Sequence, residues 1–115
     1  MRYLFVLNDP PYGTERSYNG LRLASSLLKE EGSEVDVFLV ADAVFCAKAG
    51  QKTPDGYYNL ERMLKPIIRK GRVLLCGTCM DARGLEADDL MEGARRSSLA
   101  ELTERTIAAD KVLVF

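Results

Sequence analysis

The feature that most constrains this chain is an alternation of short apolar runs with segments of helical character. The runs are five to seven residues long, as buried strands are, and lie at residues 2–7, 34–40, 72–76 and 111–115. None approaches the roughly 18 apolar residues of a membrane span. Strands that alternate with helices predict right-handed crossovers and a mainly parallel sheet with helices on both faces. We therefore expect an α/β fold with four to five strands.

The clearest helix prediction falls on residues 60–68, where apolar residues recur at positions i, i+3, i+4, i+7 and i+8. Another helix is expected after Thr14, whose hydroxyl can cap it, with Gly32 as its left-handed stop. Ser98 and Glu101 match a capping box, which predicts a helix that continues to about residue 109.

Shorter elements complete the prediction. Short helices are expected at residues 41–50 and 87–91, and a loop at 51–56. The pattern of residues 94–97 is ambiguous, and a short fifth strand is one interpretation of it. The sequence has 115 residues and contains neither repeats nor linkers, so one domain over residues 1–115 is predicted.

The composition limits the function. Sixteen basic and 17 acidic residues leave a net charge of −1, so no overall field favours nucleic acid or an anionic membrane. The chain has no histidine, which excludes imidazole chemistry. Its first apolar run is too short for a signal peptide, so we expect a cytoplasmic protein whose three cysteines are free thiols.

The strongest candidate site is the CxxC pair that follows the third apolar run. Cys76 closes the run, Cys79 lies three residues later, and Arg83 and Gly84 follow. The carboxyl end of a strand is where open α/β sheets bind their ligands. The Arg83 charge and the N–H groups around Gly77 and Thr78 are expected to favour the thiolate, which is the reactive form.

Three other interpretations of this pair stay open. A zinc site needs four ligands, so two nearby thiols would have to share a metal across an oligomer interface. A thioredoxin-like dithiol fits the CxxC spacing. However, all four prolines precede Cys76, so the proline that faces the dithiol downstream in thioredoxins is absent. Two small buried hydrophobic residues are the third interpretation, and packing is also what we expect of Cys46.

A second candidate site is the turn at residues 8–14, between the first strand and the first helix. Its residues Tyr12, Gly13 and Thr14 lie where helix N–H groups can bind an anion. No phosphate-loop glycine pattern is present, so a rigid turn is the competing interpretation. Because parallel strands open on one edge, this turn and the cysteine loop are predicted to line one pocket, with Tyr12 as a wall.

At the level of motifs the chain resembles the DsrE/DsrF-like family, and in particular its YchN-like branch. The resemblance covers nearly the whole chain in order and rests on residues 8–15, 21–24, 42–44, 50–52, 76–84 and 109–113. It implies a three-layer α/β/α sandwich of DsrEFH type, which forms a homo-oligomer, often a trimer or hexamer.

The resemblance also implies a role for the cysteines. In sulfur-relay members of this family the active cysteine closes a strand and stands seven residues before an Arg-Gly pair. Cys76 has that spacing to Arg83, so the persulfide-bearing role is assigned to Cys76. Cys79 belongs to the YchN-like version of the motif and is expected to resolve or share the sulfur.

The resemblance, together with the position of Cys76 at the end of a strand, thus implies a sulfur carrier that accepts sulfane sulfur on Cys76 and passes it to a thiol of a partner protein. No cofactor or metal is required, and proton movement would fall to water, Asp81 or the thiols themselves. Two other hypotheses are a dithiol redox protein and a non-catalytic oligomeric module that binds a small molecule or anion.

Overall fold

A computed structural model describes all residues, 1–115, and shows a five-stranded sheet in which every strand pair is parallel. The strand order is β4-β3-β2-β1-β5. In chain order the elements are β1 (Arg2–Leu7), α1 (Arg16–Leu28), β2 (Glu34–Leu39), the 3₁₀ helix η1 (Ala41–Ala47), α2 (Leu60–Lys70), β3 (Arg72–Cys76), α3 (Gly77–Ala82), the 3₁₀ helix η2 (Ala87–Asp89), β4 (Ala94–Ser97), α4 (Leu99–Ala108) and β5 (Lys111–Val114).

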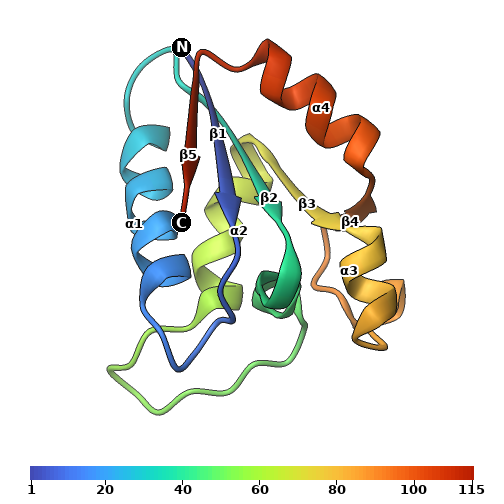
Figure 1. Cartoon of the computed structure of the whole chain (residues 1–115). Coiled ribbons are helices and arrows are strands. Elements are labelled where there is room, and N and C mark those ends of the chain that lie inside the picture. The colour runs from blue at the N-terminus through green and yellow to red at the C-terminus, as the bar shows by residue number, and fades with distance from the viewer.

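The two faces of the sheet are covered unequally. Alternate residues of β1, β2 and β3 join α1, α2 and η1 in a core cluster of 20 buried residues. On the other face only Leu4, Phe38 and Leu74 are fully buried, and Leu102 of α4 packs against them. Figure 1 shows α1 and α2 together and α4 apart from them. The predicted three-layer α/β/α sandwich with a parallel sheet is confirmed, with a single helix as one of its layers.

Capping residues explain where two of the helices begin. The side chain of Asn59 accepts a hydrogen bond from the backbone N–H of Arg62 and caps α2. The hydroxyl of Ser98 accepts one from the N–H of Glu101 at the start of α4, as predicted. The Glu101 carboxylate does not complete the capping box, because it accepts from Arg95 and Ser97 instead.

Three sequence predictions need correction. Thr14 does not cap α1: its hydroxyl donates to the Asp9 carboxylate at 2.9 Å, and the helix begins at Arg16 without a side-chain cap. The segment after Cys76 is a short helix and not a loop. The helices expected at 41–50 and 87–91 are 3₁₀ helices over 41–47 and 87–89. Residues 94–97, which the sequence left ambiguous, form the strand β4.

No helix combines the length and the apolar character that crossing a membrane would require.

Candidate functional site

The candidate site is built where β3 passes directly into α3. Cys76 is the last residue of the strand and the N-cap of the helix, and its Sγ accepts a hydrogen bond from the N–H of Cys79 at 3.4 Å. A second hydrogen bond joins Cys76 Sγ to the hydroxyl of Thr78 at 3.2 Å. Cys76 is half-buried on the α4 face of the sheet, where it packs against the smaller apolar cluster.

The two thiols differ in acidity. Burial raises the pKa of Cys76, but hydrogen bonds from the Cys79 thiol, the Thr78 hydroxyl and the N–H groups of both residues outweigh burial, so the pKa lies below its usual value. Burial raises the pKa of Cys79, and its hydrogen bond to Cys76 raises it further. Cys76 is therefore the more acidic thiol of the pair.

The second thiol is held by η1. The backbone N–H of Ala41 donates to Cys79 Sγ at 3.2 Å. Ala41 has a φ of 51°, the one positive φ among the non-glycine residues, which costs about 1–2 kcal/mol for an L-residue. Backbone strain of this kind collects at functional sites, and here it brings an N–H donor to the sulfur.

Arg83 forms hydrogen bonds with Cys79 and with η1. Its Nε donates to the Asp42 carboxylate at 2.8 Å and its Nη1 to the Cys79 carbonyl at 3.1 Å, which ties η1 to the end of α3. The Arg83 charge lowers the pKa of Cys79 slightly against the larger effects of burial. The hydrogen bonds of Arg83 are therefore to Asp42 and to the Cys79 backbone, and the expected effect of its charge on the Cys76 thiolate stays a prediction.

The guanidinium beside Cys76 belongs to Arg96, which the sequence did not single out. Arg96 donates two hydrogen bonds to Asp81, at 2.7 and 2.9 Å, and its side chain lies over Gly77. A Cβ on Gly77 would stand 2.7 Å from Arg96 Nε, so a larger residue here would displace the flexible Arg96 side chain from this position. The hydrogen bonds and charge of Asp81 are the main causes that raise the pKa of Arg96, and Cys76 adds a smaller effect in the same direction. Arg96 in turn lowers the pKa of Asp81. Asp81 is thus a poor proton donor.

Tyr12 lies on the other face of the sheet from Cys76. Its ring packs against the larger core, and its hydroxyl donates to Gln51 at 2.6 Å and accepts from the N–H of Leu60 at 3.2 Å. Burial raises the pKa of Tyr12 above its usual value. Gly13 has a φ of +95° and Thr14 bonds to Asp9, so both serve the turn. Tyr12 packs against the larger apolar cluster and Cys76 against the smaller one, so the prediction that Tyr12 forms a wall beside the Cys76 thiol is wrong.

The third cysteine is a packing residue, as expected. Cys46 is fully buried in the larger core, and burial raises the pKa of its thiol to about 12. No group of three or more His, Cys, Asp or Glu side chains is arranged to hold a metal ion.

Fold and site together define a class: α/β proteins that carry a half-exposed cysteine of lowered pKa at the carboxyl edge of a parallel sheet. Comparison with known proteins narrows this class. The chain belongs to the DsrE/DsrF-like family, whose model matches residues 1–115.

Individual relatives agree with this assignment. The chain is 40% identical to Protein YchN of Escherichia coli (strain K12), over 99% of this chain and 98% of that protein. It matches the crystal structure of that protein with a TM-score of 0.93, over 99% of this chain and 98% of the other. More distantly, it is 27% identical to Sulfurtransferase TusD of Salmonella typhi, over the full length of both.

Proposed function

We propose that this protein is a sulfur carrier that holds sulfane sulfur as a persulfide on Cys76. The observation that carries the proposal is the setting of Cys76: it is partly exposed at the carboxyl end of β3, and its Sγ is hydrogen-bonded to the Cys79 N–H and the Thr78 hydroxyl. These hydrogen bonds lower the pKa of Cys76 despite its burial. Membership of the DsrE/DsrF-like family and the similarity to a protein named as a sulfurtransferase support a sulfur-relay role.

Loading is a thiolate exchange without net oxidation. The Cys76 thiolate attacks the outer sulfur of a donor persulfide, R–S–SH, a new S–S bond forms, and the donor leaves as the thiolate R–S⁻. The product is Cys76–S–SH. The Thr78 hydroxyl and the Cys79 N–H, which hold the thiolate, lie beside the site where this bond forms. The charge of Arg96 favours the anionic persulfide.

Unloading is the same exchange in the other direction. A thiolate of an acceptor protein attacks the outer sulfur of Cys76–S–SH, takes that sulfur, and returns Cys76 as a thiolate. The hydrogen bonds to Cys76 Sγ lower the pKa of the leaving thiol, which speeds its departure.

Cys79 offers a competing reaction. If its thiolate attacked the inner sulfur of the persulfide, a Cys76–Cys79 disulfide would form and hydrosulfide would leave. Burial, the largest cause that raises the pKa of Cys79, does not depend on the sulfur load and slows this attack without preventing it.

The test is intact-mass spectrometry after incubation with glutathione persulfide. We expect the wild-type protein to gain one sulfur atom, which reductant removes, and Cys76→Ser to gain none. Cys46→Ala serves as the control, because Cys46 is buried away from the site. No adduct on any variant, together with slow alkylation of Cys76, would refute sulfur carriage and favour a non-catalytic binding module.

A dithiol redox protein is the second candidate function, and the CxxC spacing favours it, because the Cys79 N–H donates to Cys76 Sγ and so holds the two residues together. A redox role predicts a Cys76–Cys79 disulfide that glutathione buffers form reversibly, with no retention of sulfur. Titration of the disulfide in such buffers, run beside the persulfide assay, separates the two functions.

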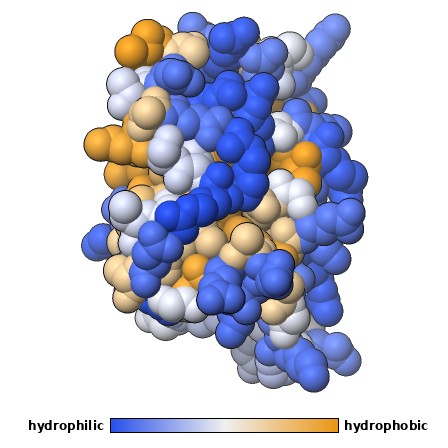
Figure 2. Space-filling model, turned by 90° about the vertical axis from the view of Figure 1, so that its right-hand side faces the viewer, coloured by the Kyte–Doolittle hydropathy of each residue, from blue (hydrophilic) through white to orange (hydrophobic).

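We further propose that the α4 face joins copies of this chain in a homo-oligomer. Apolar side chains of α4 and β5 stay exposed there, including Ile107 at 80% and Val114 at 67%. The side of the molecule that carries α3, β4 and α4 is otherwise mostly hydrophilic, with separate hydrophobic patches (Figure 2). Light scattering should show an assembly that Ile107→Glu and Val114→Lys dissociate, and a monomeric wild type would refute it.

A further inference from the structure

A cavity of about 330 Å³ lies at the amino-terminal edge of the sheet, between the starts of β1, β2 and β3 and the end of α4. It is distinct from the cysteine site: Arg72, which lines it, begins β3, and Cys76 ends the same strand, roughly 13 Å away at the usual rise of a strand. The proposed sulfur chemistry makes no use of this cavity.

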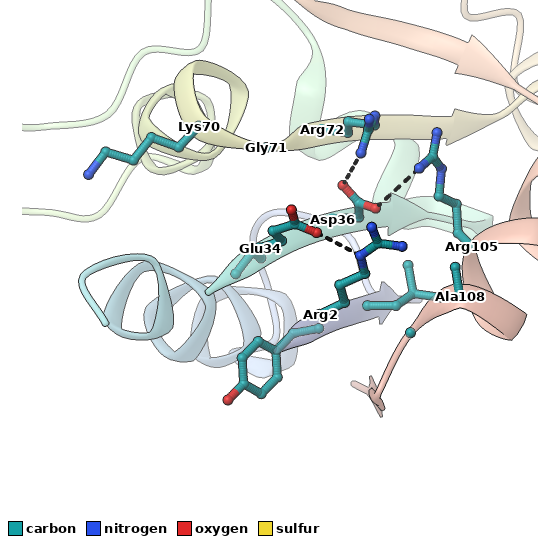
Figure 3. Close-up of a pocket in the computed structure, with 12 residues that line it drawn as sticks. Arg2, Glu34, Asp36, Lys70, Gly71, Arg72, Arg105 and Ala108 are labelled. Atoms are coloured by element: carbon teal, nitrogen blue, oxygen red, sulfur yellow. Dashed lines mark hydrogen bonds and ion pairs between the residues drawn. The ribbon is translucent and has the colours of Figure 1, made fainter. Parts of the chain in front are cut away.

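The lining is dominated by positive charge. The lining contains four cationic side chains, those of Arg2, Lys70, Arg72 and Arg105. It contains only two carboxylates, those of Glu34 and Asp36. Figure 3 shows the guanidinium groups of Arg2, Arg72 and Arg105 gathered around Asp36, while Lys70 extends away from them.

Both carboxylates are already paired, and the arginines keep free donors. Arg2 uses its Nε for Glu34 at 2.8 Å, and Arg72 uses one Nη for Asp36 at 3.3 Å. A guanidinium carries five N–H donors in a planar fork. Each of these two arginines therefore retains most of its donors for a further acceptor.

Arg105 is the least satisfied of the three. Its side chain is 28% exposed, its Nε is buried without a hydrogen-bond partner, and its nearest carboxylate oxygens lie 3.9 Å away on Asp36 and 3.7 Å away on Glu101. Both distances exceed hydrogen-bond length. The Glu101 carboxylate already accepts two hydrogen bonds from Arg95, and it makes no hydrogen bond to Arg105.

Other charges near the cavity do not cancel this excess. Asp110 accepts the backbone N–H of Arg2 at 2.7 Å, outside the lining. The carboxyl end of α4 adds about half a negative charge, which is smaller than the excess of positive charge in the lining.

We propose that this cavity binds a small oxyanion of the phosphate class, held by Arg2, Arg72 and Arg105. A tetrahedral oxyanion offers several acceptor oxygens, and planar guanidinium forks bind such groups with paired charge-assisted hydrogen bonds. The cavity is larger than inorganic phosphate requires, so it also admits the phosphate of a small phosphomonoester.

Isothermal titration of the full-length protein at constant ionic strength tests the proposal, with inorganic phosphate in one arm and glycerol phosphate in the other. We expect saturable binding that Arg105→Gln weakens by at least about tenfold, the loss of a charge-assisted contact. Tighter binding of glycerol phosphate would assign the site to a phosphomonoester, and tighter binding of phosphate to the free ion.

Two further variants keep the test decisive. Arg72→Gln removes a second guanidinium and should also weaken binding, even where Arg105→Gln fails to fold. Arg62→Gln removes one positive charge from the exposed surface of α2, outside the cavity, and should bind as the wild type does. An equal loss in Arg62→Gln, or no saturable binding by the wild type, would overturn the proposal. Dissociation of an oligomer by Arg105→Gln without phosphate binding would assign the cavity to a subunit contact.

Discussion

Removal of the Thr78 hydroxyl tests how Cys76 is activated. The hydroxyl lies 3.2 Å from Cys76 Sγ, and once the thiol is ionised only the hydroxyl can donate in this hydrogen bond. Hydrogen bonds to charged groups contribute about 1.5–3 kcal/mol. Since Thr78 is exposed and water can partly replace it, we take about 1 kcal/mol for Thr78→Val. The thiolate population below the pKa then falls about fivefold.

In Thr78→Val the alkylation rate of Cys76 should change less than the thiolate population does. Whether the variant is slower or faster than the wild type should depend on pH. A less stabilised thiolate is more nucleophilic, and a Brønsted coefficient of about 0.4–0.5 makes each thiolate about twofold faster. Below the pKa of Cys76 the variant should therefore be alkylated about two- to threefold more slowly than the wild type. Above it the variant should be about twofold faster, so the two pH–rate curves cross.

The assay is alkylation by iodoacetamide across a pH series, with the modification of Cys76 followed by peptide mass spectrometry. Thr103→Val is the matched control, because the Thr103 hydroxyl donates to the Leu99 carbonyl on α4, away from the thiols. A rate reduced equally at every pH would mean that valine only blocks access. That result, or two coincident curves, would refute the proposed role of the hydroxyl.

Three further perturbations probe neighbouring contacts. Cys79→Ser should lengthen the lifetime of a persulfide on Cys76, because no second thiol can release hydrosulfide; a mass-spectrometric time course that matches the wild type would contradict this. Arg96→Gln should raise the pKa of Cys76 and slow its alkylation at neutral pH, and an unshifted pH profile would exclude an electrostatic effect. Hydrogen bonds from Arg95 and Ser97 lower the pKa of Glu101 from 4.5 to about 2. Its folded pKa is thus depressed, so its stabilisation is complete above pH 4.5 and is lost as the pH falls toward 2. Denaturant unfolding of Glu101→Gln should therefore depend less on pH in this interval, and an unchanged dependence would count against the pairing.

The fold could be predicted largely because its strands are buried. The run at β3 is apolar on both faces, as an inner parallel strand must be, and it places Cys76 at the carboxyl edge of the sheet without any tertiary information. The edge strand β4 consists of Ala94, Arg95, Arg96 and Ser97, and it has no such pattern. Its pairing is set by tertiary packing.

The site could be predicted only where its contacts are local. Thr78 and Cys79 lie within three residues of Cys76, so the connection from strand to helix brings them together. Arg96 reaches the site because β4 pairs with β3 in a register that sets Ser97 opposite Cys76. Strand order and register are not local properties. The position of Arg83 could not be predicted either, because its guanidinium binds Asp42 on η1, which is 41 residues away in the sequence.

The strand order also has a consequence for how the chain is made. β1 lies between β2 and β5 in the sheet, and its pairing with β5 joins Tyr3 to Lys111 (Figure 1). Synthesis proceeds from the amino end, so β1, β2 and β3 can associate early. The other edge of β1 stays unpaired until residues 111–114 have been made. Contacts between residues that are far apart in the sequence form slowly, and an unpaired strand edge can pair with a strand of another chain. A nascent chain halted before Lys111 should therefore aggregate through the amino-terminal strand.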